Sequence, residues 1–146
     1  MGNFPEPRAG MVIRYVYLWS DEAERQVIEG AKGRPCAIVV AVESGRDGGA
    51  VQVAVVPVTH ARPHDPEVAI ELPARVKAAL GLDAEPSWIM LDEMNVFDWP
   101  GYDLRPIGRG SDRVDYGFLP PRYFARLMEQ LTGIAREIGV TQVLRD

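Results

Sequence analysis

The chain has 146 residues, the length of one ordinary domain. Hydrophobic residues make up 47% and charged residues 25%, which excludes a wholly disordered or fibrous chain. The formal net charge of −5 argues against a surface that attracts nucleic acid as a whole, although it is compatible with a local basic cleft. We therefore expect residues 1–146 to form a single domain.

Cysteine content and hydropathy indicate the compartment. Cys36 is the single cysteine, so an intramolecular disulfide is excluded and a reducing environment is suitable. The first residues lack the apolar segment of a secretion signal, and no apolar run approaches the ~20 residues of a membrane-spanning helix. With two histidines and no cysteine pair, a structural zinc site is disfavoured. The sequence predicts a cytoplasmic protein with no membrane partner, no metal and no other cofactor.

The first third of the chain predicts a tail, a strand and a short helix. Residues 1–10 contain prolines that favour an extended backbone, so a tail is expected. Residues 11–19 are β-branched and aromatic, as in a strand. Ser20 is a typical N-cap, and the acidic residues after it suit a first turn. A short helix or ordered loop should end near Gly30 or Gly33.

The middle of the chain predicts further short strands. Apolar runs at 36–42 and 51–58 are joined by the glycine-rich segment 44–49, a pattern typical of a hairpin. Residues 68–72 alternate as in another strand, and residues 87–92 read as a strand as well. Two smaller features accompany them, namely a helical segment at 73–80 stopped by Gly81 and a turn at 99–101.

The last predicted element is an amphipathic helix. Pro120 and Pro121 open it, and Gly139 ends it. Its apolar residues recur at steps of three and four, which gives one apolar face: Phe124, Leu127, Leu131, Ile134 and Ile138. Short strands in succession, closed by one helix, favour a mainly β fold, a small antiparallel barrel plus C-terminal helix over residues 11–138.

Three residues near strand ends carry candidate chemistry. Arg34, held between Gly33 and Pro35, can present its planar guanidinium to a phosphate, or it can be an ordinary surface arginine. Thr59 ends a strand, where its hydroxyl can donate to a phosphoryl oxygen. His60 can act as a general acid or base. The alternative for this pair is a strand threonine beside an exposed loop histidine.

Other candidates are weaker. Asp92 ends a predicted strand next to another acid, and because consecutive strand residues point to opposite faces, at most one of the two enters a given cleft. Trp99, in a predicted loop, can stack an unpaired base or simply pack. Arg105 and Arg109 lie in a loop of mixed charge, which indicates either a solvated surface or a small cationic patch that binds RNA.

The order of these segments resembles the MazF/PemK family of toxins from bacterial type II toxin–antitoxin systems. The resemblance covers about residues 10–138. Its motifs are Gly33-Arg34-Pro35 before an apolar strand, Pro57-Val58-Thr59 after a glycine hairpin, Ser87-Trp88-Ile89 in a strand that ends in an acid, and a helix after Tyr116-Gly117-Phe118-Leu119.

The resemblance implies an SH3-like β-barrel with a C-terminal helix, forming a homodimer that a cognate antitoxin protein neutralises. It implies metal-independent cleavage of single-stranded mRNA to 2′,3′-cyclic phosphate and 5′-hydroxyl ends. Arg34 and Thr59 match the family's catalytic arginine and threonine. Glu29 falls where many members carry an acid, and Asp92 matches an acid of the Kid/PemK branch.

Two positions depart from the family pattern. Ile28 replaces a histidine and Met90 replaces an arginine of the Kid/PemK branch, so an acid or base must come from elsewhere. We hypothesise that His60 supplies one of them. Two alternatives stay open: a CcdB-like toxin that binds its target without cleaving RNA, and an SH3-like interaction module whose active site has decayed.

Overall fold

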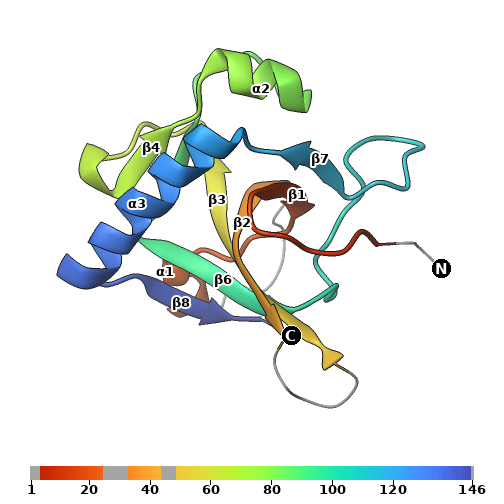
Figure 1. The fold of residues 1–146 in the computed structure, drawn as a ribbon, viewed down its shortest axis with the longest axis horizontal. Coiled ribbons are helices and arrows are strands. Elements are labelled where there is room, and N and C mark those ends of the chain that lie inside the picture. The colour runs from red at the N-terminus through yellow and green to blue at the C-terminus, as the bar shows by residue number, and fades with distance from the viewer. Residues whose placement is uncertain (1–3, 25–32, 44–48, 146) are drawn as a thin grey trace.

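A computed structural model describes residues 4–24, 33–43 and 49–145 (Figure 1). The strands of this part are β1 (Met11–Tyr15), β2 (Arg34–Glu43), β3 (Val51–Thr59), β4 (Ala69–Glu71), β5 (Trp88–Met90), β6 (Glu93–Asp98), β7 (Asp115–Phe118) and β8 (Thr141–Leu144). The helices are α1 (Ser20–Glu24), the short 3-10 helix η2 (Pro66–Val68), α2 (Ala74–Leu80) and α3 (Pro121–Glu137).

One sheet contains all the strands of the described part, and β3 is its central strand. The neighbours follow the order β4-β5-β3-β2-β1-β7, and β6 pairs with both β3 and β8. The first half of β3 pairs with β6, whereas its last residues pair with β5. The mainly β class with a C-terminal helix is confirmed. The described strands do not close into a complete barrel, and β8 runs parallel to β6 rather than antiparallel.

Alternating residues of the strands supply two cores, one on each side of the sheet. Val56 of β3 packs with the α3 residues Leu127 and Leu131 on one side. On the other side Val55 packs with the β1 residue Tyr15 and a separate group of buried side chains. Figure 1 shows α3 lying along one side of the sheet and α2 at one end of the molecule.

Helix α3 begins and ends close to the predicted positions, but its apolar face differs in two residues. Ile138 follows the last turn and is 66% exposed, because the helix ends before this residue can reach the sheet. Tyr123 is buried instead, and its hydroxyl donates to the Glu71 backbone oxygen at 2.8 Å. The predicted strand at 87–92 corresponds to the shorter β5, which ends at Met90, and the separate strand β6 starts after it at Glu93.

The β2–β3 pairing brings the sequence candidates together. These strands are antiparallel, with Cys36 opposite Pro57 and Ala37 opposite Val56. Two residues further along the same register, the start of β2 at Arg34 meets the end of β3 at Thr59. The antiparallel hairpin expected from the sequence therefore positions both residues at the same end of these two strands, although its turn at 44–48 lies outside the described residues.

Candidate active-site cleft

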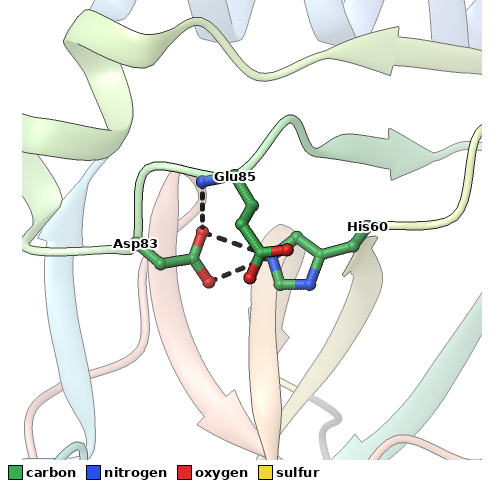
Figure 2. A group of neighbouring side chains, drawn as sticks. All are labelled: His60, Asp83 and Glu85. Carbon is green, nitrogen blue, oxygen red and sulfur yellow. Dashed lines mark hydrogen bonds and ion pairs between the residues drawn. The ribbon is translucent and has the colours of Figure 1, made fainter.

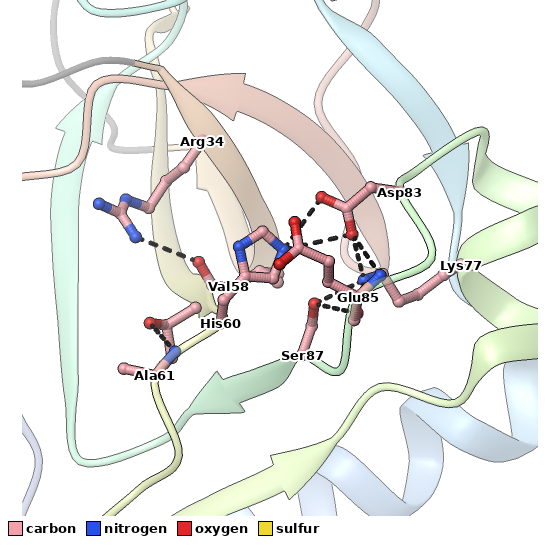
Figure 3. A network of polar contacts seen from close by, with 9 residues as sticks. Arg34, Val58, His60, Ala61, Lys77, Asp83, Glu85 and Ser87 are labelled. Carbon is pink, nitrogen blue, oxygen red and sulfur yellow. Dashed lines mark hydrogen bonds and ion pairs between the residues drawn. The ribbon is translucent and has the colours of Figure 1, made fainter.

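A cleft of about 250 Å³ lies where β2 begins and β3 ends. Three sequence candidates, Arg34, Thr59 and His60, contribute to its lining. The remaining lining comes from the chain on either side of them, from α2 and from the segment after α2: Gly33, Pro35, Val58, Lys77, Leu82, Asp83 and Ser87. Figure 3 shows the polar contacts around this cleft.

Contacts with a ring and with the backbone hold the Arg34 side chain in place. Among the described residues, no carboxylate forms an ion pair with it. Its guanidinium lies over the Trp19 ring, 5.1 Å from the centroid. Nη1 donates to the Val58 backbone oxygen at 3.4 Å, and the buried Nε has no hydrogen-bond partner among the described residues. A guanidinium fixed by stacking and a backbone contact is well suited to receive an anion.

Two further arginines lie beside the start of β2. A Cβ built on Gly33 would come within 2.9 Å of Arg14 Nε and 3.4 Å of Arg105 Cγ, so both side chains pass close to this glycine. Arg105 also donates through Nη1 to the backbone oxygens of Tyr102 and Leu104, each at 2.9 Å. The molecule thus carries a local group of arginines near Gly33 despite its acidic net charge, although of these only Arg34 lines the cleft.

Thr59 and His60 present different groups at the end of β3. The Thr59 hydroxyl oxygen accepts from the Ala61 backbone N–H at 3.1 Å, an interaction that leaves its own proton free to donate. The His60 ring is exposed, and its Nε2 lies 3.0 Å from Asp83 Oδ2. The cleft therefore combines a cation, a hydroxyl donor and an imidazole.

A buried lysine lies behind His60. Lys77 Nζ donates to Asp83 Oδ1 at 2.6 Å, to Ser87 Oγ at 2.6 Å and to the Glu85 backbone oxygen. The Lys77 side chain is only 4% exposed, whereas that of Asp83 is half exposed. The hydrogen bond from Lys77 is the largest cause that lowers the pKa of the Asp83 carboxyl below its usual value.

His60, Asp83 and Glu85 also form a possible group of metal ligands (Figure 2). Their ligand atoms lie within 4.8 Å of one another, and all three residues are exposed. The Lys77 ammonium already contacts Asp83 Oδ1 at 2.6 Å. It therefore neutralises one of the two carboxylates of this group and repels a second cation. This charge arrangement opposes a divalent metal here.

Asp92 does not line the cleft, and its neighbour Glu93 has the more informative contacts. Asp92 is half-buried between β5 and β6, where its backbone oxygen accepts from Thr141 N at 3.0 Å. Glu93 accepts from the Tyr17 hydroxyl at 3.1 Å and from Ser20 N at 2.8 Å. Burial raises the pKa of the Glu93 carboxyl. Glu93 thereby fixes the segment that carries Trp19 over Arg34.

The remaining sequence candidates lie elsewhere. The Trp99 backbone N–H donates to the oxygen of Val51, the first residue of β3, so Trp99 lies at the end of β3 remote from Thr59. Its ring packs against Phe97 with a centroid distance of 6.3 Å. Arg109 is exposed in the loop before β7 and does not line the cleft.

The departures from the family pattern fall in different places. Met90, in β5, is half-buried and packs against the core on the α3 side, so this position is filled by an apolar contact rather than by a charged group. Glu29 and Ile28 lie outside the described residues.

Sequence reasoning missed Lys77, Asp83 and Ser87. A lysine in a short predicted helix looks like a surface residue, because lysine is rarely buried. The available signal was the close spacing of Asp83, Glu85 and Ser87 directly after a helix, which supplies several oxygen acceptors to one nearby donor.

Among the described residues, no helix combines the length and apolar character that crossing a membrane requires. No protein-family model matches the chain, and no curated protein is significantly similar to it.

Proposed function

We propose that the protein is the toxin component of a type II toxin–antitoxin system, a metal-independent endoribonuclease that cleaves single-stranded mRNA in this cleft. The observation that carries the proposal is the convergence of Arg34, Thr59 and His60 on one cleft, where β2 begins and β3 ends. A cation, a hydroxyl donor and an imidazole can supply the charge stabilisation, hydrogen bonding and proton transfer that phosphodiester transesterification uses.

The proposed reaction uses a general base, a cation that stabilises the charge of the phosphorane, and a hydrogen-bond donor to a non-bridging phosphate oxygen. His60 removes the proton from a ribose 2′-hydroxyl, and the 2′-oxygen forms a bond to the adjacent phosphorus. The bond from phosphorus to the 5′-oxygen breaks, and that oxygen takes a proton from water, leaving a 2′,3′-cyclic phosphate and a 5′-hydroxyl. Arg34 offsets the charge that develops on the phosphorane, and the free Thr59 proton donates to a non-bridging oxygen.

Positive charge close to the cleft supports RNA binding there. Arg14 and Arg105 flank Gly33, directly before Arg34, whereas the Lys77 charge is matched by Asp83. Since the net charge is −5, RNA binding must depend on these local arginines, and we expect it to weaken as added salt screens their contacts with phosphate.

The proposed setting follows from the resemblance of the sequence to the toxin family. It is a cytoplasmic homodimer whose activity a cognate antitoxin blocks. Light scattering on the purified protein tests the dimer, because a scattering mass near one chain contradicts it.

End mapping tests the reaction. The purified protein is incubated with a long RNA in EDTA, and the ends are mapped and typed. Discrete cuts with 5′-hydroxyl ends support the proposal, and His60→Ala should remove them whereas His64→Ala, the matched control at the other histidine, should not. Cutting that requires added Mg²⁺ would favour His60, Asp83 and Glu85 as metal ligands.

Two other results would also contradict ribonuclease activity. Growth arrest on expression with intact transcripts would indicate a CcdB-like binding toxin. The absence of both growth arrest and cleavage would indicate an interaction module with a decayed site. The apolar Met90, at a position where the family has an arginine, would be consistent with such a decayed site.

A further inference from the structure

We propose that Lys77 and Asp83 are positioning residues that hold His60 with a proton on Nε2 and a free lone pair on Nδ1, turned into the cleft. The inference depends on two successive contacts: the buried Lys77 ammonium binds the Asp83 carboxylate, and that carboxylate contacts the His60 imidazole. The chemical use of the lone pair rests on the proposed RNA cleavage, whereas the protonation pattern itself does not.

Lys77 is the buried residue of this series of contacts. An ammonium has three protons to donate, and its three acceptors take all of them: Asp83, Ser87 and the Glu85 backbone oxygen. With its side chain 4% exposed, Lys77 is not available to a substrate and acts on the cleft through Asp83. A charge buried this deeply needs its partner, so Asp83 is held in one orientation.

The orientation of Asp83 decides which nitrogen of His60 carries the proton. Oδ1 accepts from Lys77 and also from Glu85 N at 3.1 Å, while His60 Nε2 lies 3.0 Å from Oδ2 and 3.2 Å from Oδ1. Because an ionised carboxylate only accepts hydrogen bonds, Nε2 must be the donor. In the neutral ring Nδ1 is then the free base.

The other charged groups around His60 fit this role. Asp83 and Glu85 flank the ring on one side, and in Figure 3 the second ring nitrogen points to the side on which Arg34 lies. A base facing Arg34 is on the side where a phosphate would bind. The same logic operates in serine proteases, where a buried aspartate selects the histidine tautomer and its replacement by asparagine lowers turnover about 10⁴-fold.

The Asp83→Asn variant tests the proposal directly. Lys77 and Glu85 N both require an acceptor at the Oδ1 position, so the asparagine amide nitrogen takes the place of Oδ2, the Asp83 atom nearest to His60 Nε2. A donor at that position opposes a proton on Nε2, so we expect the ring proton to move to Nδ1. Long-range ¹H–¹⁵N NMR of labelled protein, at a pH where the rings are neutral, reports the tautomer of each histidine. His60→Ala and His64→Ala variants assign the signals.

We expect wild-type His60 to be protonated on Nε2, with that proton exchanging more slowly than the ring proton of exposed His64. Asp83→Asn should convert His60 to the Nδ1–H form and leave His64 unchanged. Asp112→Asn, which removes the same charge at an exposed loop position outside the cleft, should change neither ring. An unprotonated Nε2 in the wild type overturns the proposal without any variant, and so does a folded Asp83→Asn protein that keeps the wild-type tautomer.

RNA cleavage by the same variants separates this proposal from the proposed function. Asp83→Asn should lower kcat roughly 10²-fold or more while KM stays within about threefold, since the change affects the base and not the anion contacts. Asp83→Glu, which keeps a carboxylate, should retain the Nε2–H form and recover part of the rate. If the wild type does not cleave RNA, the proposed function fails and the NMR result still decides the positioning. If it does cleave RNA and Asp83→Asn keeps both tautomer and kcat, the positioning fails alone.

Discussion

The Arg34 guanidinium lies over the Trp19 ring, 5.1 Å from its centroid, and this contact joins the start of β2 to the segment after β1. That segment is fixed in turn, because Ser20 N donates to Glu93 at 2.8 Å and Trp19 N donates to Glu22 at 3.1 Å. The orientation of the central cation therefore depends on an acid in β6, far away in the sequence.

Replacing Arg34 should separate activity from stability. Arg34→Ala removes the proposed stabiliser of the phosphorane charge, and we expect RNA cleavage to fall by about 10² to 10³. The unfolding free energy should change by only about 1 kcal/mol, since the partly buried side chain contributes one long backbone hydrogen bond and one ring contact. Cleavage rates and urea unfolding measure both. A folded variant with wild-type cleavage would contradict the assigned role.

Glu93 should give the stability a pH dependence of a known sign. Burial raises the pKa of this carboxyl, so the folded chain keeps its proton at pH values where the unfolded chain has released it. The contribution of Glu93 to stability is therefore present at low pH and is lost as the pH rises through the folded-state pKa. Glu93→Gln removes this titration and keeps an acceptor for Tyr17 and Ser20.

Urea unfolding of both proteins between about pH 4 and 7 checks the prediction. Relative to Glu93→Gln, the wild type should lose stability as the pH rises above the ordinary glutamate value. A difference that stays constant or grows in favour of the wild type would show that the pKa of Glu93 is not raised.

Asp83 should behave in the opposite way. Its pKa is lowered, chiefly by the hydrogen bond from Lys77, so its contribution to stability is present above the ordinary aspartate value and is lost as the pH falls through the folded-state pKa. Lys77→Met keeps the buried volume and removes the ammonium. Carboxyl ¹³C titration should show the Asp83 midpoint below the ordinary aspartate value in the wild type and higher in Lys77→Met. Equal Asp83 midpoints in the two proteins would exclude Lys77 as the cause.

Helix α3 should contribute strongly to the core on its side of the sheet. Leu127 is fully buried there, and Leu127→Ala should lower the unfolding free energy by about 2–5 kcal/mol. Leu144→Ala is the matched control, because Leu144 is 76% exposed and should change stability by less than about 0.5 kcal/mol. Similar unfolding midpoints for the two variants would be inconsistent with the packing of α3.

Patterns of neighbouring residues in the sequence were sufficient to predict helix α3 and the β2–β3 hairpin. The proline pair, the three- and four-residue steps and Gly139 located α3, and the paired apolar runs located the β2–β3 hairpin. The hairpin register then brought Arg34 and Thr59 together, which the sequence suggested only through the family resemblance.

The rest depends on partners that are distant in the chain. Asn95 looks polar enough to interrupt a strand, yet it is fully buried in β6, because it exchanges hydrogen bonds with the backbone of Leu18 at 2.9 and 2.8 Å. Strand β8 was missed because only Val143 of its four residues is buried, which leaves no alternation to detect. Lys77 is buried for a similar reason, since its acceptors lie in the segment after α2.

The most direct test of the proposed function is the chemical nature of the RNA ends produced in EDTA. The proposed mechanism predicts discrete cuts that carry a 2′,3′-cyclic phosphate and a 5′-hydroxyl, formed by the wild type and absent with Arg34→Ala. RNA that stays intact with the folded wild-type protein, or ends that carry a 5′-phosphate, would contradict it.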